Sequence, residues 1–173
     1  MKKTKFIELG YPANDPLYDK DLDKKADELK TKLGIPKNKK VLLYAPTWRD
    51  DNSYGAGEYK FELALDLKRL KEEIGDEYVI LLRMHYWIVD KLDLTGMSDF
   101  VINVSNYSDI TDIYIVSDIC MTDYSSVFLT MLILNALFCT ICMTLKNTET
   151  FLEVFILILK KNFRDQYFRL TMK

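Results

Sequence analysis

The residues best suited to chemistry lie in three short polar clusters, each directly after an apolar run. They are Ala45-Pro46-Thr47-Trp48-Arg49 after Val41 to Tyr44, Arg83-Met84-His85 after Tyr78 to Leu82, and Thr122-Asp123-Tyr124-Ser125-Ser126 after Asp118 to Met121. Ligands of open parallel sheets bind at the carboxyl ends of the strands, so the three clusters are expected to meet at one edge. Their Thr, Arg, His, Asp and paired Ser side chains predict a site for a phosphorylated ligand.

His85 is the only histidine among the 173 residues, and Arg83 stands two positions before it. An imidazole with a pKa near neutrality can move a proton or hold a phosphate oxygen. A lone histidine can equally be structural. Arg83 could bind a phosphate through its planar guanidinium group, or it could form an ordinary surface ion pair.

Ser125 and Ser126 precede an apolar stretch, where a serine can cap a helix. The same position also suits an anion, because the N-terminus of a helix carries partial positive charge. Asp123 either orients a neighbouring Ser or His or starts that helix as a capping residue. After the first strand, Thr47 and Arg49 could contact a pyrophosphate.

Apolar runs alternate with helical patterns along the first 128 residues, which predicts an α/β fold with a Rossmann-like parallel sheet and flanking helices. Four strands are expected, at 41–44, 78–82, 100–104 and 118–121. Helices are expected at 22–33, ending at Gly34, and at 109–116. A further helix is expected to carry Leu63, Leu67, Leu70 and Ile74 on one face. We also expect a short helical turn at 87–92 and a loop at 50–60.

Composition sets limits on the function. The net charge of −2 lacks the excess of basic residues that is typical of nucleic-acid-binding proteins. The three cysteines are an odd number, which argues against a disulfide framework. The lone pair Cys139 and Cys142 has metal-ligand spacing but no second pair and no nearby histidine, so we expect no metal and no cofactor. No signal peptide and no apolar run of about 18 residues is present, so no membrane-spanning helix is expected.

Five strings, in order, resemble the CDP-glycerol glycerophosphotransferase family of teichoic acid polymerases and primases. They are Gly10-Tyr11-Pro12-Ala13-Asn14-Asp15, Tyr44-Ala45-Pro46-Thr47-Trp48-Arg49-Asp50, Leu82-Arg83-Met84-His85, Val104-Ser105-Asn106-Tyr107 and Thr122-Asp123-Tyr124-Ser125-Ser126-Val127-Phe128. The resemblance implies one half of a GT-B-type fold, which has two Rossmann-like halves. Residues 1–128 would be a partial CDP-glycerol-binding domain, with 1–20 as a connecting segment.

The resemblance also implies a reaction, in which an acceptor hydroxyl attacks the glycerol-bearing phosphate of CDP-glycerol and CMP leaves. His85 matches one of two functional histidines of the family and is the catalytic candidate. The full set of predicted substrate-binding residues, including Arg49 and Asp123 from the cluster argument, is Pro46, Thr47, Arg49, Arg83, Met84, Asp123, Ser125, Ser126, Val127 and Phe128. The implied partners are CDP-glycerol and a lipid-linked teichoic acid acceptor, at the inner face of the cell membrane on its cytoplasmic side.

Two departures from the family pattern bear on activity. The second functional histidine of the family lies in an N-terminal half that this sequence does not contain, so that half is an expected partner. Ala13 stands where the family usually has Arg, which removes a phosphate contact. Three alternatives to an active transferase therefore stay open: a nucleotide-binding remnant without turnover, an inert pseudogene product, and a relative that uses CDP-ribitol.

Residues 129–173 differ in character from the rest of the chain. They contain no Gly or Pro and carry 6 basic and 3 acidic side chains, whereas residues 1–128 carry 18 basic and 23 acidic side chains. Read one base out of frame, Leu129 to Leu137 can spell D-Y-A-N-L-K-R-P, the string with which the family continues. Two further stretches, Met143 to Thr150 and Leu152 to Lys160, match later family strings in the same way. We therefore predict a frameshifted, poorly packed tail over 129–173.

Overall fold

The computed structural model describes residues 11–46, 65–84 and 93–122, the backbone of 137–140, and isolated positions at 63, 130, 131, 133, 134, 153, 155, 156 and 159. These residues build a five-stranded parallel sheet with the strand order β3-β2-β1-β4-β5. This is the 3-2-1-4-5 order of Rossmann-type sheets, in which the chain reverses its direction of travel across the sheet beside β1. The predicted fold class is confirmed.

Four strands match the predicted apolar runs to within a residue at either end. They are β1 (Lys40–Ala45), β2 (Tyr78–Leu82), β3 (Val101–Asn103) and β4 (Ile119–Thr122). The fifth, β5 (Leu137–Thr140), was not predicted and lies within the expected tail. It pairs in parallel with β4, Leu137 standing opposite Ile119.

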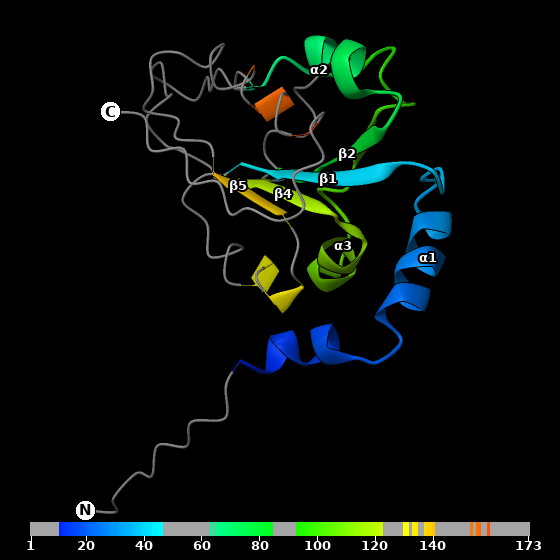
Figure 1. Ribbon diagram of the computed structural model, residues 1–173, viewed down its shortest axis with the longest axis vertical. Coiled ribbons are helices and arrows are strands. Elements are labelled where there is room, and N and C mark those ends of the chain that lie inside the picture. Colours follow the sequence, from blue (N-terminus) through cyan, green and yellow to red (C-terminus); the bar gives the residue numbers. More distant parts are fainter. Residues whose placement is uncertain are drawn as a thin grey trace, which may run out of the picture.

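Both faces of the sheet are buried, because the strand side chains alternate between two apolar clusters. In β1, Leu42 and Tyr44 pack on one face, while Val41 and Leu43 pack on the other. Figure 1 shows helix α2 (Leu67–Ile74) over the first face, with α1 (Leu22–Lys32) and α3 (Ile110–Val116) on the other side. Burial on both faces explains why the strands read as continuous apolar runs.

Local sequence signals fix where the helices begin and end. After α1, Gly34 has a φ of 71°, and the amides of Gly34 and Ile35 donate to the carbonyls of Thr31 and Lys30. This glycine stop was predicted, and it closes the helix in a Schellman arrangement. Asp66 caps α2 by accepting hydrogen bonds from the amides of Lys68 and Arg69. The helix therefore starts at Leu67, and the prediction that Leu63 belongs to its face is wrong.

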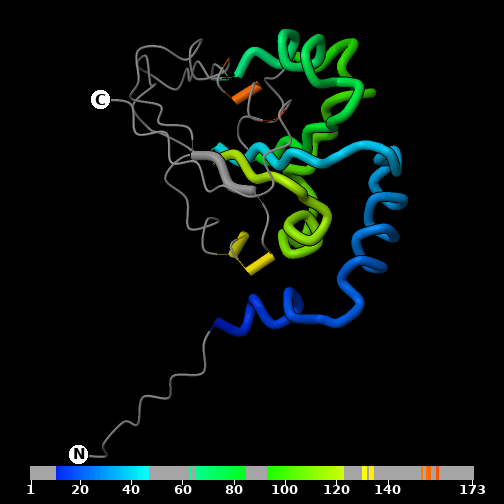
Figure 2. Tube along the Cα trace, in the orientation of Figure 1, coloured from blue at the N-terminus to red at the C-terminus, as the bar shows by residue number. Residues whose placement is uncertain are grey.

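The first described residues run along the α1 and α3 side of the sheet. A short 3-10 helix, η1 (Pro12–Tyr18), contacts α3, and α1 packs on α3 next. Figure 2 follows this path in blue, from η1 through the length of α1 to the start of β1. The predicted connecting segment is thus partly helical, because Pro12 fixes a helical φ at the first position.

Several described positions beyond residue 128 pack against the sheet. Met131 joins the cluster on the α1 side, and Phe155, Ile156 and Leu159 join the cluster on the α2 side. At these four positions the expectation of poor packing does not hold, because apolar side chains bury against any apolar face that is available. The boundary at 128 stays a prediction. The turn predicted at 87–92 and the loop at 50–60 lie outside the described residues.

Candidate functional site

The carboxyl ends of β1 and β4 lie side by side, where the strand order reverses. Ala45 of β1 stands opposite Thr122 of β4, and the Thr122 hydroxyl donates a hydrogen bond to the Ala45 carbonyl. Pro46 follows directly, and it is the last described residue before the predicted contacts at 47–49. Ligands of Rossmann-type sheets bind at this reversal point, which makes this edge the candidate site.

Arg83 follows β2 at the same edge and is held by both neighbouring strands. Its backbone amide donates to the carbonyl of Tyr44 at 2.9 Å. Its Nη1 atom donates to the carbonyls of Val104 at 3.0 Å and Tyr107 at 2.9 Å. Among the described residues, its Nε and Nη2 groups have no partner. One side of the guanidinium group thus fixes the loop after β3.

Met84 contributes to this edge through its backbone. Its side chain is only 5% exposed and lies in the apolar cluster on the α2 side. Its amide donates to the Ser105 hydroxyl oxygen at 3.0 Å, and the Ser105 amide in turn donates to the Asn103 side chain at 3.0 Å. The path of the chain toward residue 85 is therefore tied to the loop that follows β3.

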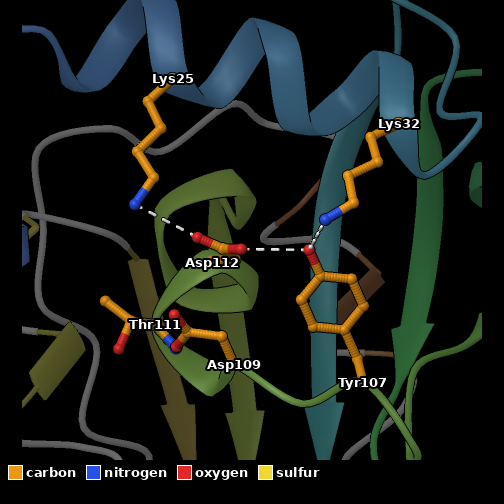
Figure 3. Close-up of polar contacts among 6 residues, drawn as sticks. All are labelled: Lys25, Lys32, Tyr107, Asp109, Thr111 and Asp112. Atoms are coloured by element: carbon orange, nitrogen blue, oxygen red, sulfur yellow. Dashed lines mark hydrogen bonds and ion pairs between the residues drawn. The ribbon is translucent and has the colours of Figure 1, made fainter.

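The loop after β3 is anchored to both helices on its side of the sheet. The Tyr107 hydroxyl accepts a hydrogen bond from Lys32 of α1 at 2.8 Å and donates one to Asp112 of α3 at 3.1 Å. Asp112 also forms an ion pair with Lys25 of α1 at 3.2 Å, as Figure 3 shows. The hydrogen bond from Lys32 to Tyr107 raises the pKa of this lysine. At the start of α3, Asp109 accepts a hydrogen bond from the Thr111 amide.

Tyr114 of α3 is a buried titratable group on the α1 and α3 side of the sheet. Burial raises the pKa of its phenol, the Cys120 thiol adds to that rise, and the positive charge of Arg83 opposes it. Tyr114 is 9% exposed.

Three of the eleven predicted site residues are described, and all three lie at the carboxyl edge: Pro46, Arg83 and Met84. The other eight lie outside the described residues: Thr47, Arg49, His85, Asp123, Ser125, Ser126, Val127 and Phe128. No role was predicted for Ser105 or Tyr107, although both stand in one of the recognised strings. The feature that could have found them is their position directly after a strand, because that position singled out the three polar clusters.

The described residues contain no group of three or more His, Cys, Asp or Glu side chains that could hold a metal ion. Within the same part of the chain, no helix is both long and apolar enough to cross a membrane.

The strand order and the flanking helices define a Rossmann-like α/β class of protein. The chain belongs to the family described as CDP-glycerol:poly(glycerophosphate) glycerophosphotransferase, whose sequence model it matches over residues 1–136. This confirms the family that the five strings predicted, and the match runs eight residues past the predicted boundary at 128.

Relatives and solved structures agree with this family. The chain is 51% identical over 128 residues to the teichoic acid poly(glycerol phosphate) polymerase of Staphylococcus epidermidis, covering 73% of this chain and 18% of that protein. It matches a structure of the wall teichoic acid polymerase TagF with a TM-score of 0.74 and 45% identity, over 83% of this chain and 35% of TagF. A TagF variant soaked with CDPG matches with a TM-score of 0.69 and 49% identity, over 76% of this chain and 32% of that chain. The chain thus spans about a fifth to a third of the relatives it matches.

Proposed function

We propose that this chain is the donor-binding half of a glycerophosphotransferase and binds CDP-glycerol at the carboxyl edge of its sheet. The observation that carries the proposal is the 51% identity to a poly(glycerol phosphate) polymerase over the residues that build this edge. The structure of the TagF variant soaked with CDPG, the abbreviation of CDP-glycerol, supports the choice of donor. The available Nε and Nη2 donors of Arg83 give the edge a group that suits a phosphate.

The reaction that this site would support is a phosphoryl transfer. An acceptor hydroxyl oxygen forms a bond to the phosphorus that carries glycerol, and the bond from that phosphorus to the bridging oxygen breaks. CMP leaves with the bridging oxygen, and the hydroxyl proton passes to a base in the N-terminal half. Arg83, His85 and the Ser125–Ser126 amides would neutralise the charge that develops on CMP, which is where such reactions gain most.

Calorimetric titration of the chain with CDP-glycerol tests donor binding. We expect saturable binding of CDP-glycerol and of CMP, and none of UDP-glucose at the same concentration. Equal binding of CDP-ribitol would mean that this half does not select the polyol. An absence of heat with both CDP-alditols would contradict the proposal and favour the inert product.

We further propose that the acceptor is a lipid-linked teichoic acid at the inner face of the cell membrane, and that its site lies mainly in an N-terminal half. Transfer would then need both halves. Mixing the chain with the N-terminal part of a relative should give release of CMP from CDP-glycerol, while the chain alone should release none. Release by the chain alone would show that a base resides within these residues.

We also propose that residues 129–173 are encoded in a shifted reading frame. The support is the agreement of three out-of-frame stretches with family strings, together with the change in composition after Phe128. Sequencing of the source DNA across the codons for Val127 to Thr130 tests this directly. One additional T in that run would restore the family string, and a run as reported would mean that the gene itself is interrupted.

A further inference from the structure

The turn after β3 presents two of its carbonyls to one nitrogen of Arg83. It runs from Val104 to Tyr107 and is closed by a hydrogen bond from the Tyr107 amide to the Val104 carbonyl at 3.0 Å. The Nη1 atom of Arg83 donates to the carbonyls of both residues, at 3.0 Å to Val104 and at 2.9 Å to Tyr107. The direction of the guanidinium plane therefore depends on where the turn lies, because the donors of arginine are fixed within that plane.

The two ends of this turn are anchored in different ways. At its first end, the Val104 amide donates to the Leu82 carbonyl of β2 at 2.9 Å, which continues the ladder between β2 and β3. At its last end, the anchor is the Tyr107 side chain. The Tyr107 hydroxyl donates to Asp112 of α3 at 3.1 Å and accepts from Lys32 of α1 at 2.8 Å, as Figure 3 shows. The position of the Tyr107 carbonyl is thus tied to the helix layer as well as to the sheet.

Asp112 is the firmer of the two partners of the Tyr107 hydroxyl. Its side chain is 16% exposed and also forms an ion pair with Lys25 of α1 at 3.2 Å. Lys32 is an exposed residue, and its ammonium group lies 5.0 Å from the centre of the Tyr107 ring. A hydrogen bond to a carboxylate that is largely shielded from water is stronger than one to a group in bulk solvent. The bond to Asp112 therefore supplies most of the anchoring.

We propose that Tyr107 is a positioning residue for Arg83, because its bond to Asp112 holds the carbonyl that orients the guanidinium group. The inference rests on the proposed function, since the contact of Arg83 with a phosphate of CDP-glycerol comes from there. Tyr107 does not need to touch the nucleotide. A guanidinium group that is held in place before the donor arrives loses less conformational freedom on binding, and affinity rises accordingly.

Rotation of the Arg83 guanidinium group gives a direct readout. Turning about the Cζ–Nε bond exchanges Nη1 with Nη2, and it requires both bonds from Nη1 to break. Nitrogen-15 exchange spectroscopy of the full chain measures the rate, and Arg83→Gln identifies which of the five arginine signals belongs to Arg83. We expect Tyr107→Phe to raise this rate about fivefold without nucleotide. Binding of CDP-glycerol should weaken about fivefold, which is the contribution of one ordinary hydrogen bond.

Two variants of Asp112 separate the hydrogen bond from the charge. Asp112→Ala removes the acceptor and should raise the rotation rate as Tyr107→Phe does. Asp112→Asn keeps an oxygen that can accept from the Tyr107 hydroxyl, although it loses the ion pair with Lys25. Its rate should stay close to that of the unmodified chain. Equal rates in the two Asp112 variants would contradict the inference.

Tyr78→Phe is the matched control, because it also removes a hydroxyl that bonds across the fold. The Tyr78 hydroxyl donates to the Leu159 carbonyl at 3.5 Å, but Tyr78 begins β2 and so stands at the amino edge of the sheet. This variant should leave the Arg83 rotation rate and the binding of CDP-glycerol unchanged, even if its melting temperature falls as much as that of Tyr107→Phe.

An Arg83 rotation rate that is unchanged in Tyr107→Phe would overturn the inference. An equal rise in Tyr78→Phe would overturn it as well, because the effect would then be general destabilisation. If the unmodified chain binds no CDP-glycerol, the proposed function fails; the rotation rate without nucleotide still decides whether Tyr107 holds Arg83 in position.

Discussion

Arg83 has a structural role that the sequence pattern did not distinguish from the proposed contact with a phosphate. The pattern offered a phosphate contact or a surface ion pair, and the structure shows a third use, a bond from Nη1 to two backbone carbonyls. Arginine suits this use because its donors point in fixed directions within one plane. Under the proposed function, Nε and Nη2 are the atoms that would bind the phosphate.

Replacement of Arg83 should therefore affect both stability and donor binding. We expect Arg83→Gln to lower the free energy of unfolding by about 1–2 kcal/mol, since two carbonyls lose a charged donor. Binding of CDP-glycerol should weaken about tenfold, from the loss of one charged contact. Urea denaturation and calorimetry measure the two effects. Lys32→Gln, which removes an exposed charge of α1 that bonds Tyr107 of the same loop, is the control and should leave binding unchanged.

Tyr114 makes stability depend on pH in the alkaline range. Because burial raises the pKa of its phenol, the folded state holds this proton more tightly than the unfolded state does. The resulting stability is present below the ordinary phenol pKa of 10.0 and is lost as the pH rises above it. Urea midpoints measured between pH 9 and about 11 should fall with pH. Tyr114→Phe should flatten that fall, and Tyr18→Phe, at an exposed position, should not; equal slopes in all three would contradict this account.

The attachment of α1 to α3 belongs to the level of secondary-structure elements. Lys25, Lys32, Tyr107 and Asp112 make one connected network between the two helices and the loop after β3. The Asp112 side chain is 16% exposed and that of Lys25 is 38% exposed, so solvent screens this pair only in part. The network holds the outer helix layer in place beneath the candidate site.

A double-mutant cycle on Lys25→Met and Asp112→Asn should reveal this coupling. We expect a coupling energy of about 0.5–1 kcal/mol in the free energy of unfolding, falling as salt is added. The exposed pair of Lys24 and Glu28, at 3.9 Å, offers a comparison within α1 and should give a smaller value. A coupling at Lys25 and Asp112 no larger than that would mean that apolar packing alone attaches the helix.

The type of each helix and strand could be predicted from the sequence, whereas the contacts between residues of different elements could not. The strands at 78–82 and 41–44 were found because burial on both faces leaves an uninterrupted apolar run. The start of α2 was misplaced because the spacing of Leu63 fits a helix, and the capping carboxylate of Asp66 decides the boundary. Ser105 and Tyr107 were missed as contacts because Met84, Arg83 and Lys32, to which they bond across the fold, are 21 or more residues away along the chain. Local patterns carry no such information.

At the scale of the whole molecule, both faces of the sheet must be covered for the fold to be stable. On the α2 side, part of the cover comes from Phe155, Ile156 and Leu159, in the region with a shifted-frame composition. Their burial does not require evolved complementarity, because the hydrophobic effect is non-directional. The proposed shift of reading frame is therefore compatible with the burial of these three side chains.

Truncation of Phe155 measures that contribution. The side chain is 1% exposed, so Phe155→Ala should lower the free energy of unfolding by about 3 kcal/mol. Chemical denaturation of the full chain is the measurement, and Glu153→Ala, at an exposed position on the same segment, is the control. A loss below about 0.5 kcal/mol, the range of ordinary surface substitutions, would show that this segment does not cover the sheet in solution.

The central claim is that CDP-glycerol binds at the carboxyl edge of the sheet, and methionine methyl resonances test it most directly. Met84 stands at that edge, just after β2, while Met97 precedes β3 at the amino edge, and both are buried in the same apolar cluster. During a titration of the full chain with CDP-glycerol, the Met84 methyl resonance should move to saturation and the Met97 resonance should stay in place. Movement of Met97 with a fixed Met84, or no movement of either at saturating nucleotide, would contradict the claim.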